Sequence, residues 1–232
     1  MTSRAFRFFL IAIALVFAGG CAPAHFSTHD ATARIGSVKT IGIIQPDIKV
    51  FQLSDDGVVL MKELSERAAK SSIEEMTAFF KGSGFKVKLI EPNLKTMKEL
   101  QEVRALSKAV HKNLREFWNP VDNIPPPTLG TLEALADLYG VEAFMFMDGF
   151  EVHKEEKAVF SKKLATLAVG TLYGPSALPK QGRSKSCVSF VEANGGVIWA
   201  SYRDAPISLD ENFKDRENTK RLVRGLLSRF PR

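Results

Sequence analysis

Cys21 is the residue whose chemistry follows most directly from its neighbours. The segment before it begins with the cations Arg4 and Arg7, continues with an apolar run over 8–17, and ends in the small residues 18–20. The apolar run is too short to span a bilayer, and this order of charge, apolar run and small residues is typical of a secretory signal peptide. A cysteine directly after the cleavage point can carry a thioether-linked lipid.

This arrangement resembles the lipobox of bacterial lipoproteins, with Ala18 where Leu is usual. The resemblance implies that residues 1–20 are removed and that acyl chains such as palmitate on Cys21 tether the protein to the lipid bilayer. Several acyl chains anchor a protein stably. By resemblance to lipoprotein sorting rules, Ala22 in place of Asp implies the periplasmic side of the outer membrane. An ordinary cleaved signal or an uncleaved anchor with a coincidental cysteine is the alternative, and both also imply export.

The length of the chain indicates one domain, and its charge indicates no nucleic-acid partner. Removing residues 1–20 from the 232 leaves 212, which fits a single domain with a sizeable core. The net charge of +6 falls to +4 without the two signal arginines, and the remaining charges form no basic stripe, so no nucleic-acid partner is expected. The expected organisation is a signal peptide over 1–20, a flexible lipid-anchored leader over 21–36 and an α/β domain over 37–232.

Hydrophobic periodicity predicts a β-α-β start and a β-hairpin finish. The β-branched run over 38–44, stopped by Pro46, suits a buried central strand, and 47–53 alternates as an edge strand or extended loop. Asn194 and Gly195 suit a tight hairpin turn. Together these patterns predict a single α/β domain with a mixed or antiparallel sheet of about five strands and helices mainly on one face. The other expected elements are helices over 58–81, 94–118, 129–139 and 210–232 and strands over 85–90, 141–150, 182–193 and 196–204.

Residues 156–179 form the segment with two open readings. Its apolar residues recur at helical spacing, but a strand over 165–173 fits as well because the run is short. Three roles are open for the apolar residues of this segment. They pack on the core of the domain, they bind a partner, or they rest on lipid with Lys162 and Lys163 beside them. The possible contact residues are Phe160, Leu164, Leu167 and Leu172, and Ala168 belongs to the same apolar stripe.

Thiols and histidines offer little chemistry. With Cys21 as the lipid site, Cys187 has no cysteine to pair with, and it lies in an alternating run that suits a buried small hydrophobe; a catalytic thiol would need a cation or helix N-terminus and a histidine base. No metal site, catalytic residue or cofactor is expected, because the histidines form no spaced cluster. They are His25 and His29 in the leader, His111 on a polar helix face, and His153 beyond a strand.

Three carboxylates form the strongest candidate for a site. Asp47, Asp148 and Glu151 all lie near predicted strand ends and could meet at one end of the sheet. If they did, the protein would be a periplasmic enzyme or a small-molecule binder with a carboxylate-lined cleft. This is the alternative to a non-catalytic role.

Three segments carry a resemblance to a known group of envelope proteins. They are VKTIGII with Gln45 and Pro46, LEALADLYGVEAFMFMDGF, and CVSFVEANGGVIWASYRD. Their order resembles lipoproteins related to the CsgG curli-secretion subunit, the amino-terminal domain of TolB, and the lipoprotein activators of penicillin-binding proteins, such as LpoB. The matching positions are Gly140, Asp148, Gly149, Glu192, Gly195 and Trp199.

The resemblance implies a fold and a class of role. Roles in this group range from pore subunit to enzyme activator to scaffold, so the fold carries over better than the function. A pore would need long membrane-entering hairpins, and only 156–179 could contribute; a TolB-like protein would need a following propeller. We therefore expect a non-catalytic, lipid-anchored envelope protein that acts by contact with unidentified envelope proteins, with homo-oligomerisation as a possibility.

Overall fold

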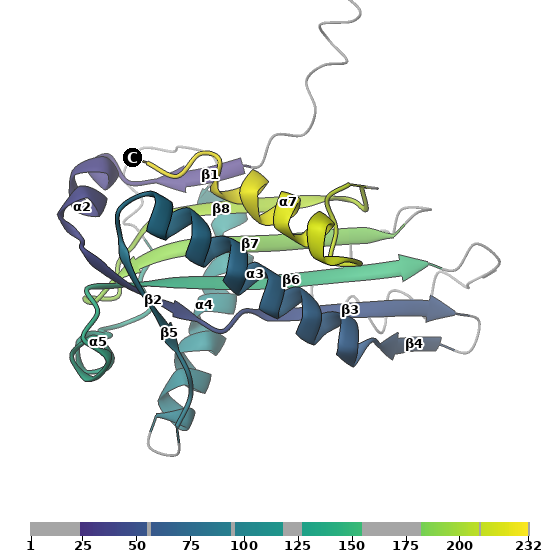
Figure 1. The fold of residues 1–232 in the computed structure, drawn as a ribbon, viewed down its shortest axis with the longest axis horizontal. Coiled ribbons are helices and arrows are strands. Elements are labelled where there is room, and N and C mark those ends of the chain that lie inside the picture. Colours follow the sequence, from purple (N-terminus) through teal and green to yellow (C-terminus); the bar gives the residue numbers. More distant parts are fainter. Residues whose placement is uncertain are drawn as a thin grey trace, which may run out of the picture.

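The chain folds as one α/β domain around an eight-stranded mixed sheet (Figure 1). The computed structural model describes residues 24–54, 57–93, 96–117, 127–154, 182–208 and 210–231. The sheet has more strands than the five expected, because β1 and β4 add to it and residues 47–53, left open between an edge strand and a loop, form β3, which pairs with both β4 and β6. The strands are β1 (Ala24–Ser27), β2 (Thr40–Ile44), β3 (Asp47–Ser54), β4 (Gly57–Leu60), β5 (Lys86–Ile90), β6 (Ala143–Lys154), β7 (Arg183–Glu192) and β8 (Val197–Pro206), and the helices are α2 (Ala31–Ser37), α3 (Lys62–Gly82), α4 (Met97–Phe117), α5 (Glu133–Tyr139) and α7 (Arg216–Leu227).

The strand β6 is the centre of the sheet. The order β1-β8-β7-β6-β2-β5 places β7 antiparallel along one edge of β6, while β2 and then β3 run parallel along its other edge. Since β2 also pairs in parallel with β5, the apolar run before Pro46 lies inside the sheet, as its β-branched composition predicted. The mixed sheet matches the expected class.

The chain that runs from β2 into β3 contains one residue more than the stretch of β6 that it faces. Ile43 pairs with Met145, and Asp47 pairs with Asp148, so three residues on one strand oppose two on the other. Pro46, which has no N–H to donate, lies at this irregularity. The extra residue acts as a β-bulge and reverses which side chains face which side of the sheet.

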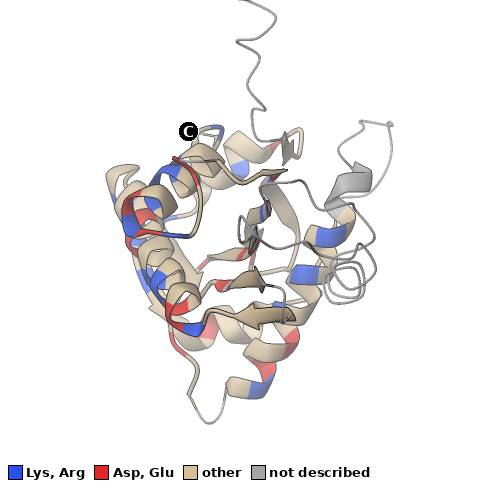
Figure 2. Cartoon of the chain, turned by 90° about the vertical axis from the view of Figure 1, so that its right-hand side faces the viewer, with Lys and Arg blue, Asp and Glu red and all other residues tan. Residues whose placement is uncertain are grey.

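Helices cover both faces of the sheet, which corrects the expectation of helices mainly on one face (Figures 1 and 2). One apolar cluster joins α2, α3 and α7 to the sheet, and a second joins α4 and α5 to the opposite face. The physical reason lies in β6, where the neighbours Phe144 and Met145 point to opposite faces and both are buried. A strand that is apolar on both sides requires cover on both sides.

Residues 24–36 of the expected leader belong to the domain. β1 pairs with β8, and α2 buries Ala31 and Ile35 in the first core cluster. Arg34 of α2 forms a two-point ion pair with Glu192, beside the β7–β8 turn. The expected flexible leader is therefore wrong over residues 24–36, since these short elements gain their order from distant partners.

Other boundaries differ from the sequence expectation by a few residues. Residues 57–60, expected as the start of a helix, form the edge strand β4 and pair with β3 before α3 begins at Lys62. The helix expected over 129–139 begins at Glu133 and ends, as expected, at Gly140, which has the left-handed conformation. Between β7 and β8, Asn194 and Gly195 lie in the turn, and Gly195 has a φ of 85°.

Some expected features lie outside the described residues. Cys21 and the apolar stripe of Phe160, Leu164, Leu167 and Leu172 belong to these parts. Among the helices that are described, none is both long enough and apolar enough to cross a membrane.

Phe230, near the C-terminus, packs in the first core cluster and allows a stability test. Its ring centroid lies 5.0 Å from that of Trp199 and 5.1 Å from that of Phe80, both with edge-on geometry. We predict that Phe230→Ala lowers the free energy of unfolding by about 3–5 kcal/mol, because it leaves a cavity among rings. Urea denaturation measures this change. The control Leu138→Ala removes a side chain that is 62% exposed and should change stability by about 0.5 kcal/mol or less. Equal effects of the two variants would contradict the assigned packing.

Candidate functional site

Two of the three expected carboxylates meet, and the third does not. Asp47 on β3 and Asp148 on β6 are register partners, and both side chains face α4. Glu151 lies three residues beyond Asp148, so strand alternation points it to the opposite face. The three-carboxylate cluster is therefore corrected to a pair.

Glu151 has a structural role on the α7 side. It is fully buried, and its carboxylate accepts hydrogen bonds of 3.0 and 3.2 Å from the backbone N–H of Phe213. The Phe213 ring lies against Gly149, where a Cβ would come within 2.6 Å of it. Glu151 and Gly149 thus fix the segment that leads into α7.

Basic residues of α4 face the aspartate pair. Lys108 forms an ion pair with Asp47, and the Nδ1 of His111 contacts an oxygen of Asp148. The Nε2 of His111 lies 2.8 Å from the hydroxyl oxygen of Ser189 on β7. His111 is buried, with 3% exposure, which corrects the expectation of a polar helix face. Its position at helical spacing from the buried Leu100, Val103 and Ser107 was the signal that could have placed it on the inner face.

The order Asp148, His111, Ser189 is that of a catalytic triad, but the surroundings differ. Ser189 is 1% exposed and lies inside β7, paired on one side with β6 and on the other with β8. A nucleophile must reach a substrate carbonyl beside free N–H donors. In this geometry the three residues form an internal polar link that joins α4 to the sheet.

Cys187 lies beside this link and is unsuited to act as a nucleophile. It is buried in the second core cluster, opposite Asp148 in the register. Burial raises the pKa of the Cys187 thiol well above its ordinary value, and the charge of Asp148 raises it further. The thiol therefore stays protonated and packs as a small hydrophobe, in line with its expected role.

A cleft of about 260 Å³ opens beside the link, between α4 and the sheet. Figure 2 looks at one end of the sheet and shows basic positions of α4 on the opposite side from α3 and α7. Sequence reasoning missed this site because its lining comes from five separate elements. The lining residues are Lys49, Lys108, Ala109, His111, Lys112, Asp148, Phe150, Lys185, Ser186, Cys187 and Tyr202.

One border of the cleft is stiffened by a charge network around Asp204 on β8. Arg183 donates a 2.8 Å hydrogen bond to Asp204, the Tyr202 hydroxyl donates another of 2.8 Å, and the Lys185 ammonium lies 3.6 Å away. Burial by itself would raise the pKa of Asp204, but these hydrogen bonds and charges outweigh it and lower the pKa below its ordinary value. The carboxylate is held ionised.

The chain matches known proteins in structure but not in sequence. No protein-family model matches the chain, and no curated protein does. Among solved structures, the chain is similar to a dodecamer of a PelC point variant from Paraburkholderia phytofirmans. The sequence identity is 8% and the TM-score 0.35, over 83% of this chain and 88% of that chain.

The polar link predicts a measurable loss of stability. His111→Ala leaves the buried Ser189 and the partly buried Asp148 without their shared partner, so we expect the free energy of unfolding to fall by about 1–3 kcal/mol. Urea denaturation at neutral pH measures it. The matched control His29→Ala changes an exposed histidine and should leave stability unchanged. A His111→Ala protein as stable as the control would show that the link contributes nothing.

The lowered pKa of Asp204 predicts a pH-dependent difference between the wild type and Asp204→Asn. The stabilisation from the carboxylate is present above its unfolded pKa, about 3.9, and is lost as the pH falls through the lowered folded value. The wild type should therefore exceed the variant in stability at pH 7, and the gap should shrink below about pH 4. Urea denaturation across this range tests it, with the exposed Asp137→Asn as control. A gap independent of pH would refute the prediction.

Proposed function

We propose that this protein is a lipid-anchored protein of the bacterial envelope that acts by contact with other envelope proteins, without covalent chemistry. The observation that carries the proposal is the position of Cys21, directly after a signal-like segment and three residues before β1. An extended chain spans at most about 3.6 Å per residue. A lipid on Cys21 would therefore hold the edge of the sheet within roughly 11 Å of the modified residue.

The placement of the resembling segments supports the same proposal. They contribute β2, the α5–β6 unit and the β7–β8 hairpin, which are neighbours in one sheet. Asp148 and Ser189 are engaged by His111, so the triad-like group serves the structure. We propose the periplasmic side of the outer membrane as the location, and other copies of this chain among the contact partners.

The chain provides a matched pair of cysteines for testing the anchor. Cys21→Ala should abolish incorporation of labelled palmitate and leave an unprocessed precursor, because the acceptor sulfur is gone. Cys187→Ala should remain labelled, since this thiol is buried in the domain. Labelling of cells followed by fractionation reads out both variants. Continued acylation of the Cys21→Ala protein, or equal loss in the two variants, would refute the anchor.

Contact with partners is tested separately from the anchor. Cross-linking in intact cells, followed by purification from solubilised membranes, should recover a defined complex of the wild type. Size-exclusion chromatography with light scattering then tells whether the complex contains several copies of this chain. A protein that remains a monomer without cross-linked neighbours would overturn the proposed contact function while leaving the anchor untouched.

A further inference from the structure

The cleft between α4 and the sheet has two walls of different origin. The sheet supplies residues from β3, β6, β7 and β8, and α4 supplies Lys108, Ala109 and Lys112. Phe150 and Cys187 lie at the base but are only 2% and 1% exposed, so the apolar surface open to a ligand comes mainly from Ala109, Tyr202 and the methylene stems of the lysines. A concave apolar surface with a few charged groups around it is the usual form of a small-molecule site.

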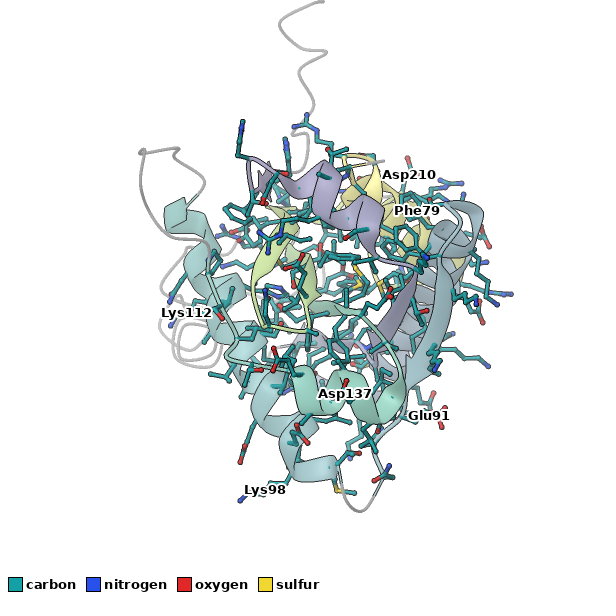
Figure 3. All side chains as sticks on the ribbon, turned by 90° about the vertical axis from the view of Figure 1, so that its left-hand side faces the viewer. Phe79, Glu91, Lys98, Lys112, Asp137 and Asp210 are labelled. Atoms are coloured by element: carbon teal, nitrogen blue, oxygen red, sulfur yellow. The ribbon has the colours of Figure 1, made fainter. Side chains whose placement is uncertain are left out.

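The charges around the cleft do not cancel. Lys108 is paired with Asp47, Lys185 shares Asp204 with Arg183, and Asp148 is engaged by His111. Lys49 and Lys112 also line the cleft, and within the described residues neither forms an ion pair with a carboxylate. Lys49 belongs to β3. Lys112 belongs to α4 and is labelled on that helix in Figure 3. Among the described residues, these two positive charges of the cleft thus have no carboxylate partner.

We propose that this cleft binds a small amphipathic carboxylate, a single anionic group with a short apolar chain. The carboxylate lies between the ammonium groups of Lys49 and Lys112, where charge-assisted hydrogen bonds are strong. The apolar chain lies against Tyr202 and Ala109, and the methylene stems of the lysines cover its sides. The proposal goes beyond the contact function and does not depend on lipidation of Cys21.

Calorimetric titration with octanoate, below the concentration at which it forms micelles, tests the proposal. The protein is the chain from residue 21 with Cys21→Ser, which keeps every residue that the structure describes. One octanoate should bind per chain. Octanol lacks the charge and inorganic phosphate lacks the chain, so each should bind at least about tenfold more weakly. Absence of octanoate binding, or equal binding of either comparison compound, would overturn the proposal.

Variants that reverse the charge of the two lysines test whether octanoate binds in the cleft. The double variant Lys49→Glu with Lys112→Glu should weaken octanoate binding at least about tenfold. Lys98→Glu is the matched control, because Lys98 lies on the same helix with a side chain that is 90% exposed and outside the cleft. Thermal denaturation checks that both proteins are folded. Should the double variant fail to fold, Lys49→Gln and Lys112→Gln replace it, each expected to weaken binding about threefold. Unchanged affinity in the folded variants, or an equal loss in Lys98→Glu, would refute the assigned site.

Discussion

The register between the β2–β3 edge and β6 is the constraint on which the rest of the structure depends. Before Gln45, the odd-numbered residues Ile41 and Ile43 face α3; after Pro46, the even-numbered Ile48 and Val50 do so. One extra residue makes this change, because side chains alternate with a period of two. As a result, Asp47 and Lys49 face α4. Without it, two charges would enter the apolar layer under α3, where unpaired burial is costly.

The helix α4 is held to the sheet by two different kinds of interaction. Its first turns bury Leu100 and Val103 against the second core cluster, and this burial supplies most of the driving force. Farther along, Ser107 and His111 face inward, and the polar link to Asp148 and Ser189 fixes the helix at a defined place. Buried polar groups of this kind add little net stability but penalise other arrangements strongly, because each alternative leaves a group unsatisfied. The cleft lies beside this polar half of the interface.

Local patterns predicted the elements whose signals are local. The central strand 38–44, the long helices, the hairpin and the helix end at Gly140 all follow from periodicity and turn chemistry. β1 and α2 were missed because pairing with β8 and the Arg34–Glu192 ion pair create their order. Which side chains of β3 face α4 could not be predicted, because this depends on a one-residue bulge. The inner face of α4 was also missed, because it carries polar residues that periodicity assigns to solvent. The cleft could not be predicted, because its lining gathers residues from Lys49 to Tyr202.

The pairing of β1 with β8 has a consequence for the order in which the protein can fold. Ala24 lies opposite Tyr202, so the first described strand is completed only by the last strand of the sheet. The pairing of Ala24 with Tyr202 closes a loop over most of the chain, and long-range pairings of this kind form slowly. During synthesis the N-terminus emerges first, whereas the strand it pairs with, β8, emerges almost last. The pairing of β1 with β8 is therefore expected to be among the last steps in folding of the domain.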